Sequence, residues 1–169
     1  MSSIGLMYDA KKVDLLVEAF LSISPPENYK LVLAGRFYTE QKNRVLALLS
    51  GSRFAANVVI EDRFLEIEDV NEYIAASDYV AATYDRHYAN ASLVFRACLA
   101  GKPLLLSDSG WLGRYGGMYP CGIMTDIHDR NDYAAKIRLL FSGNVENRHL
   151  LTGRHGEESF KQGLRKPLI

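Results

Sequence analysis

Short apolar runs alternate with amphipathic patterns along most of the chain. The first run covers residues 4–8, and after it Val13, Leu16, Val17 and Phe20 recur at the spacing of one helix face. Further apolar runs follow, most of them separated by another helical pattern. We predict buried strands over residues 4–8, 30–34, 57–60, 78–83, 104–107 and 122–124. We predict helices over residues 11–22, 39–50, 90–100 and 131–141, with a short, very polar surface helix within 61–78.

This alternation predicts the fold class. Strands that are joined through helices form βαβ units, whose strands lie parallel and whose helices cover the sheet. We therefore predict an α/β fold with a Rossmann-like parallel sheet of about six strands and helices on both faces. Residues 1–143 are expected to form this domain. Residues 110–117 are expected to be a glycine-rich loop within it, and residues 144–169 a C-terminal helical tail.

Composition and charge restrict the classes of partner. The chain has 169 residues, of which 48% are hydrophobic and 24% charged, which is typical of one folded domain. Its 20 basic and 20 acidic side chains cancel, so no nucleic-acid partner is expected. No apolar run is long enough for a transmembrane segment and no signal-peptide pattern precedes the first strand. We expect a cytoplasmic protein, peripheral to a membrane at most in its full-length form.

The motifs of several common site classes are missing from the sequence. Gly35 does not belong to a GxGxxG fingerprint, and there is no GxxxxGK[ST] phosphate loop. GxSxG, HExxH and Asp-x-Asp are also missing, which disfavours a hydrolase elbow, a zinc protease and a carboxylate pair on a divalent metal. Cys98 and Cys121 lack a metal-binding spacing. We expect neither a resident cofactor nor a metal.

The loops that follow the strands are the places to look for a ligand, because parallel α/β sheets bind ligands at the carboxyl ends of their strands. In residues 84–92, Asn90 or Ser92 can cap the next helix, and Arg86, His87 and Arg96 lie close by in sequence. A helix start with free N–H groups and added cations suits a phosphate-bearing ligand. An ordinary solvated cap explains the same residues equally well.

Three further cations follow the first two strands. Lys11 and Lys12 come after the first, and Arg36 comes after the second. Taken alone they are more typical of ordinary surface residues than of a ligand site.

Four segments, in this order, resemble the carboxyl-terminal half of the group 1 glycosyltransferases, a large retaining family with the two-domain GT-B fold. The similarity spans about residues 3 to 142 and is carried by IGLMYDAKKVDLLVEAF, KLVLAGR, VNEYIAASDYVAATYD and FRACLAGKPLLLSDSGWLG. In that family this half binds the nucleotide-diphosphate-sugar donor, and the other half binds the acceptor. The resemblance implies transfer of a hexose to a glycan or lipid-linked acceptor, with the donor as substrate and no separate cofactor.

The resemblance also implies a set of substrate-binding residues. Lys11 matches the lysine on the donor diphosphate, Gly35 and Arg36 border the nucleotide, and Arg63 lies in the loop beside the base. Backbone N–H groups from the start of the later helix would face sugar and phosphate. The resemblance implies this role for Asn90, Ala91, Ser92 and Leu93. To the candidate substrate-binding residues we add the neighbouring side chains of Arg86, His87, Tyr88 and Arg96, which the resemblance itself does not supply. No residue is assigned a catalytic role.

The sequence departs from the family pattern at three positions. Leu6 follows Gly5 where the family has arginine, and Tyr88 and Arg96 stand where it has two glutamates. These departures leave open a non-catalytic domain of the same fold that serves in protein interaction. A receiver-like or flavodoxin-like signalling domain is a third, weaker hypothesis, because residues 8–11 hold a single acid. With Met1 so close to the first strand, we expect a fragment without the acceptor-binding half, inactive alone.

Overall fold

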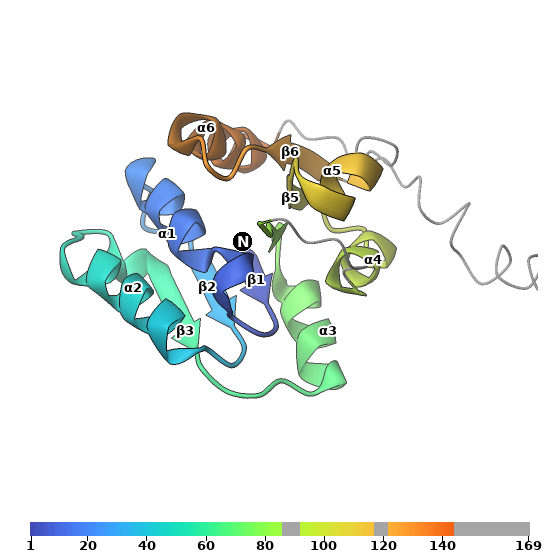
Figure 1. The fold of residues 1–169 in the computed structure, drawn as a ribbon, viewed down its shortest axis with the longest axis horizontal. Helices are drawn as coiled ribbons and strands as arrows, with labels where there is room; N and C mark the ends of the chain where they lie inside the picture. Colours follow the sequence, from blue (N-terminus) through green and yellow to red (C-terminus); the bar gives the residue numbers. More distant parts are fainter. Residues whose placement is uncertain (86–91, 117–121, 144–169) are drawn as a thin grey trace, which may run out of the picture.

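The computed structural model describes residues 1–85, 92–116 and 122–143, so the predicted tail over 144–169 lies outside the described residues. Six strands form one sheet in the order β3-β2-β1-β4-β5-β6, and every neighbouring pair is parallel (Figure 1). The strands are β1 (Ser2–Ile4), β2 (Leu31–Ala34), β3 (Val58–Glu61), β4 (Val80–Ala82), β5 (Leu104–Ser107) and β6 (Gly122–Thr125).

The connections between the strands are helical. The α-helices are α1 (Val13–Ser22), α2 (Thr39–Ser50), α3 (Ile67–Ala76), α4 (Ser92–Leu99), α5 (Gly110–Gly116) and α6 (Arg130–Phe141). Two 3₁₀ turns, η1 (Asp9–Lys11) and η2 (Ala55–Asn57), precede α1 and β3. Within the described residues, each predicted strand and helix is present, most of them within a few residues of the predicted bounds.

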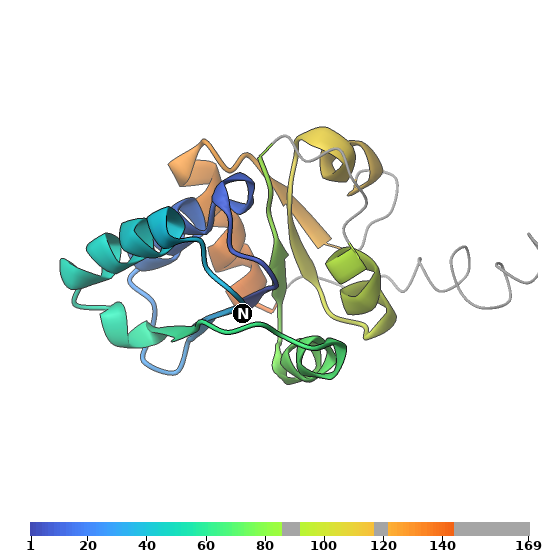
Figure 2. The ribbon, with the colours of Figure 1, turned by 60° about the horizontal axis from the view of Figure 1, so that its bottom comes forward.

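Helices cover both faces of the sheet, as Figures 1 and 2 show. On one face α1, α2 and α6 pack over a core that includes Leu105, and on the other face α3, α4 and α5 pack over Leu104 and Leu106. Successive residues of a strand point to opposite faces, so one strand supplies both cores. The predicted fold class is confirmed.

The α1 stripe shows how directly the sequence pattern determines the packing. Val13, Leu16, Val17 and Phe20 are all fully buried, as their helical spacing predicts. Because α1 packs between α2 and α6, this stripe fixes the position of the loop that connects β1 to α1.

Two predicted elements differ from the structure. The first strand ends at Ile4 instead of continuing to residue 8, because Gly5 turns the chain with φ 102°. Residues 110–117, predicted as a glycine-rich loop, contain the helix α5 instead. There Gly113 is needed for close packing, since a Cβ atom on it would lie 1.9 Å from the Asp108 carbonyl oxygen.

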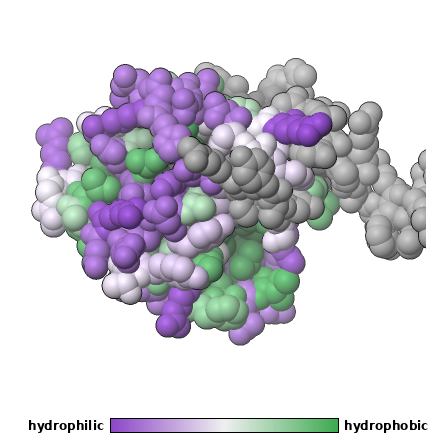
Figure 3. Space-filling model, viewed as in Figure 1, coloured by the Kyte–Doolittle hydropathy of each residue, from purple (hydrophilic) through white to green (hydrophobic). Residues whose placement is uncertain are grey.

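The hydropathy of the surface differs across the molecule. On the face seen in Figure 3, hydrophilic residues predominate over α1 and α2, and hydrophobic residues gather toward α3. Phe64, in the loop before α3, and Ile67, the first residue of α3, are among the exposed large hydrophobic residues. Within the described ranges, no helix combines the length and the apolar character that crossing a membrane requires.

Candidate functional site

The order of the strands locates a crevice at the carboxyl edge of the sheet. From β1 the chain proceeds outward to β2 and β3, and it then returns to add β4 on the other side of β1. The loops after β1 and β4 therefore diverge above a switch point, where open parallel sheets bind their ligands. The two loops touch, since the Asp85 N–H donates to the Ala10 carbonyl oxygen over 2.7 Å.

Lys11, the predicted diphosphate ligand, lies at this crevice but is turned inward. Its side chain is 1% exposed, and its amine donates a hydrogen bond to the carbonyl oxygen of Ile4. The amine also lies 5.6 Å from the centre of the Tyr84 ring. Burial lowers the pKa of the Lys11 amine to about 7 and raises the pKa of the Tyr84 hydroxyl to about 12.

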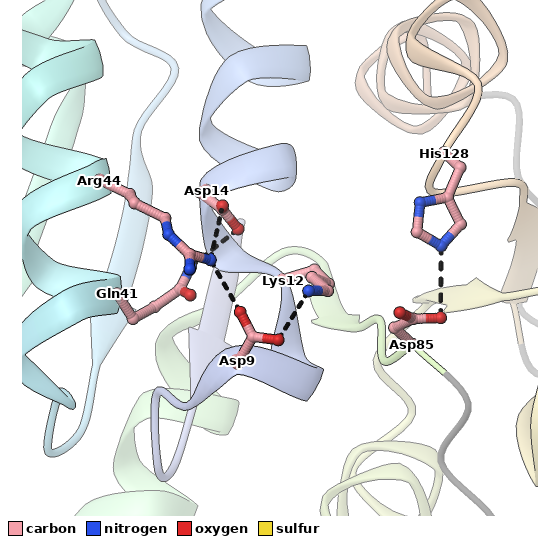
Figure 4. Close-up of polar contacts among 7 residues, drawn as sticks. All are labelled: Asp9, Lys12, Asp14, Gln41, Arg44, Asp85 and His128. Carbon is pink, nitrogen blue, oxygen red and sulfur yellow. Dashed lines mark hydrogen bonds and ion pairs between the residues drawn. The ribbon is translucent and has the colours of Figure 1, made fainter.

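A network of ion pairs holds the β1 loop against α1 and α2 (Figure 4). Asp9 accepts from Lys12 over 2.8 Å and from Arg44 over 2.7 Å, and Arg44 also lies 3.7 Å from Asp14. Lys12 has a left-handed backbone with φ 46°, an uncommon conformation for a residue with a side chain. The ion pairs therefore stabilise a bent loop that places Lys11 below the crevice.

Asp85 links the β4 loop to the β6 loop. Its carboxylate lies 3.3 Å from Nε2 of His128, which follows β6 (Figure 4). Together with the bond to Ala10, this contact makes Asp85 a junction of the loops after β1, β4 and β6.

Charge is separated along the carboxyl edge. Lys11, Lys12 and Arg36 follow β1 and β2, whereas Asp108 and Asp126 follow β5 and β6. Burial and the nearby Asp126 carboxylate raise the pKa of Asp108. Asp9, which also follows β1, pairs with Lys12. Lys11 and Arg36 therefore remain as the cations on the β1–β2 side that could meet an anion, and the carboxylates on the β5–β6 side could accept hydrogen bonds from hydroxyl groups.

Gly35 makes a backbone contact that a larger residue could not make. Its φ is 139°, and a Cβ atom on it would lie 1.9 Å from the Gly5 carbonyl oxygen. The residue that follows it, Arg36, is exposed and makes no ion pair with any residue in the described ranges. Arg36 borders a pocket of about 470 Å³ at the carboxyl end of β2.

Arg63, predicted beside the base, is engaged by its own loop. Its guanidinium donates to both carboxylate oxygens of Asp69, each over 2.8 Å, and to Glu61 over 3.0 Å. The Asp69 carboxylate also accepts the backbone N–H of Glu66 and so completes a capping box on α3. The Arg63 side chain organises the start of α3 in this structure.

The structure describes part of the predicted site around α4. Ser92 is exposed at the first residue of α4, Leu93 is buried, and Arg96 donates to the Asn71 side chain on α3 over 3.1 Å. The remaining predicted residues, Arg86, His87, Tyr88, Asn90 and Ala91, lie outside the described residues.

Sequence reasoning missed several residues of the crevice and the pocket. Tyr84 and Asp85 lie in the loop after β4, which the sequence singled out as a place for a ligand, but neither was named as a site residue. Gln41 and Arg44 approach the β1 loop from α2 and carry no local sequence signal. Among the described residues, no group of three or more His, Cys, Asp or Glu side chains is arranged to hold a metal ion.

Comparison with known proteins connects this geometry to a family. The sequence model of the family described as "Glycosyl transferases group 1" matches residues 1–154. The chain belongs to the group 1 glycosyltransferases. The resemblance drawn from the sequence segments is confirmed, and a comparison with curated proteins finds no match.

Solved structures show the same fold at low identity. The C-terminal domain of a group 1 glycosyltransferase (LpcC) from Francisella tularensis has a TM-score of 0.75 and 12% identity over 91% of this chain and 84% of that one. An α,α-trehalose-phosphate synthase (UDP-forming) from Burkholderia xenovorans, in complex with glucose-6-phosphate, has a TM-score of 0.75 and 10% identity. The match includes 98% of this chain and 43% of the synthase. The chain therefore spans less than half of that synthase.

Proposed function

We propose that this group 1 glycosyltransferase domain binds the nucleotide-diphosphate-sugar donor, with the diphosphate at the crevice between the β1 and β4 loops. The enzyme would transfer a hexose to a glycan or lipid-linked acceptor. A second domain would bind that acceptor, and this chain alone would be inactive. The donor itself is the small molecule required, and we propose no separate cofactor. The observation that carries the proposal is the lysine beside the switch point of a family-typical sheet.

Lys11 is suited to this role because its charge is poorly satisfied without an anion. Its amine has the Ile4 carbonyl and the Tyr84 ring as neighbours, and burial lowers its pKa to about 7. Burial separates the Lys11 amine from water, which would otherwise stabilise its positive charge. A diphosphate would supply an anionic partner in place of that water, and the lysine would turn toward it. The cation would then stabilise the departing nucleoside diphosphate.

The proposed donor site includes further predicted residues. Arg36 is exposed at the end of β2 and makes no ion pair within the described ranges, so it is available to border the nucleotide. Ser92 and Leu93 belong to the first turn of α4, whose backbone N–H groups suit sugar and phosphate oxygens. The residues of 86–91 complete the proposed set.

A specific contact favours a second candidate, the non-catalytic interaction domain. Arg96 stands where the family has a glutamate, and its guanidinium is bonded to Asn71 on α3. A side chain used to join two helices serves packing in this structure. The two candidates differ in whether the chain binds a nucleotide.

Thermal denaturation of the purified chain tests the proposal, with UDP, GDP, ADP and TDP and their sugar conjugates at millimolar concentration. A ligand that binds only the folded state raises the melting temperature. We expect a selective rise for one nucleotide that is lost in Lys11→Met and retained in Lys30→Met. Lys30 is a matched control, because its amine also bonds a backbone carbonyl but lies at the opposite end of β2. A chain that responds to none of these nucleotides would favour the interaction domain.

A further inference from the structure

A pocket of about 470 Å³ lies beside the crevice, at the start of α2. It is lined by side chains from η1, from the loop after β2 and from the first turns of α2. Those that carry the argument are Arg36, Tyr38, Thr39, Glu40, Gln41 and Arg44. A volume of this size accommodates a small polar metabolite, since ligand pockets begin at about 300 Å³.

One end of the pocket is arranged for an anion. The first turn of α2 leaves its N–H groups without intrahelical acceptors, and no side chain caps them. Arg36 borders the same space and makes no ion pair in the described part of the chain. The first turn of the 12-residue helix α2 and the Arg36 guanidinium together suit a phosphate group.

A buried side chain in the pocket independently points to a ligand. Gln41 is 2% exposed, and its amide donates to Asp14 over 2.8 Å, but its carbonyl oxygen accepts nothing within the described structure. In Figure 4 the Gln41 side chain extends from α2 toward Arg44, which also lines the pocket, and toward its partner Asp14. A buried acceptor without a donor is uncommon in folded proteins, and a ligand hydroxyl group is one donor that could satisfy it.

The remaining lining groups suit the body of a sugar. Glu40 adds a carboxylate that can accept hydrogen bonds from hydroxyl groups. Tyr38 presents an aromatic ring, and the residue is 58% exposed. The Tyr38 ring is held in place by the Tyr8 ring, with the two centres 6.5 Å apart. Exposed aromatic faces pack against the apolar C–H faces of sugar rings, while the polar edge of the sugar meets carboxylates and amides.

We propose that this pocket binds a sugar monophosphate, with the phosphate on the first turn of α2 and Arg36 and the hydroxyl groups on Gln41 and Glu40. Gln41 lines the pocket, but its carbonyl oxygen is buried in this structure, so a sugar hydroxyl group would reach it only if the Arg44 side chain left its ion pairs with Asp9 and Asp14. The pocket shares Arg36 with the proposed donor site but does not include Lys11. A substitution of Lys11 therefore distinguishes the two proposals.

Titration of the ¹⁵N-labelled full chain with glucose 6-phosphate tests the site directly. We expect saturable shifts of the backbone amide signals of Thr39, Glu40 and Gln41. Inorganic phosphate should shift the same signals with weaker affinity, and unphosphorylated glucose should not shift them at millimolar concentration. Equal affinity for inorganic phosphate and glucose 6-phosphate would overturn the assignment of the sugar. Amide signals that do not move would overturn the site.

A pair of substitutions at one position isolates the anion-binding contact. Thr39→Pro removes one N–H group but keeps the helix, because proline is favoured at the first helical residue and the extended Tyr38, with ψ 140°, tolerates a following proline. Thr39→Ala keeps the N–H group and removes the hydroxyl. We expect about tenfold weaker binding of glucose 6-phosphate in Thr39→Pro and a change of less than about twofold in Thr39→Ala. Equal affinities in the two variants would contradict the proposed contact.

A third variant tests the sugar end and keeps the two proposed sites distinct. Gln41→Met should lower the preference for glucose 6-phosphate over inorganic phosphate, and an unchanged preference would count against the role of Gln41. Lys11→Met should leave glucose 6-phosphate binding intact even if it abolishes nucleotide binding. If a nucleoside diphosphate moved the amides of Thr39 to Gln41 and glucose 6-phosphate did not, the pocket would be part of the donor site and the proposal would fail.

Discussion

The amine of Lys11 donates a hydrogen bond to the carbonyl oxygen of Ile4, the last residue of β1. Lys11 lies seven positions after Ile4, and the turn between them brings the lysine back beneath the end of β1. Because the side chain is 1% exposed, a positive charge on it is costly. The protonation of one buried lysine is thereby coupled to folding and, under the proposed function, to donor binding.

Lys11→Met should change the pH dependence of stability. Burial lowers the pKa of Lys11 from 10.5 to about 7 in the folded state, so between these values the unfolded chain binds more protons. The lysine therefore destabilises the fold at pH 7 and below, and that cost disappears as the pH rises to 10.5. We expect the methionine variant to be the more stable one at pH 7, as measured by urea unfolding.

The stability difference between Lys11→Met and the unsubstituted chain should then shrink with rising pH. The limiting slope is about 1.4 kcal/mol per pH unit for a single proton. The comparison cancels titrations that the two proteins share, such as that of Tyr84, whose pKa burial raises. A difference that stayed constant from pH 7 to pH 10 would show that Lys11 is not buried in this way.

Donor binding should take up a proton at Lys11. If the diphosphate pairs with the ammonium form, binding raises a pKa that is about 7 in the ligand-free protein. Affinity for the nucleotide should therefore fall as the pH increases above 7, by at most about tenfold per pH unit. Calorimetry in two buffers of different ionisation enthalpy would measure the proton uptake.

An arginine at the same position provides the control for proton uptake. Lys11→Arg keeps a cation that does not titrate in this range, so any nucleotide binding that remains should lose this part of the pH dependence. Proton uptake of the same size in the arginine variant would assign the effect to another group.

The sequence predicts the sheet well, because its patterns are local. The helical stripe of Val13, Leu16, Val17 and Phe20 is buried as expected, and the Gly101-Lys102-Pro103 segment lies between the end of α4 and the start of β5. Local sequence patterns gave the wrong secondary structure at one glycine-rich segment. Gly110 and Gly113 suggest a loop, yet their backbones belong to α5, because Gly113 packs against the Asp108 carbonyl.

The candidate site was less predictable, because its contacts join distant segments. The lysine after the first strand is evident in the sequence, but its inward direction depends on Tyr84, which lies 73 positions later. Likewise Gln41 meets Asp14 across 27 residues, and neither position carries a motif. Local patterns give the loops that border a site, and only the packed tertiary structure gives the directions of their side chains.

Arg63 should control the titration of Asp69. The Arg63 guanidinium lowers the pKa of the Asp69 carboxyl to about 2, from an ordinary value of 3.8. The ionised Asp69 carboxylate therefore stabilises the folded state above pH 4, and this contribution is lost as the pH falls through 2. In Arg63→Met the Asp69 pKa should rise toward its ordinary value, as followed by NMR of the carboxyl carbon. Because the Glu66 N–H still donates to Asp69, a small depression should remain.

A lysine–carboxylate pair between α2 and the loop after β3 is the control for that measurement. Asp62 accepts from Lys42 and from the Phe37 N–H, and these contacts lower its pKa. Its titration should not change in Arg63→Met. If the Asp69 pKa stayed near 2 in the variant, the helix start alone would account for its depression.

Gly35 should tolerate no side chain. Its φ of 139° is strained for any L residue, and a Cβ atom would lie 1.9 Å from the Gly5 carbonyl oxygen, a backbone atom that cannot rotate away. Gly35→Ala should therefore lower the free energy of unfolding by roughly 3 kcal/mol or more. Gly51 is the matched control, because it has φ −96° and nothing within 4 Å of its added Cβ. Gly51→Ala should change stability by less than about 1 kcal/mol. Equal effects of the two substitutions in urea unfolding would contradict the close approach of β1 and β2 above the crevice.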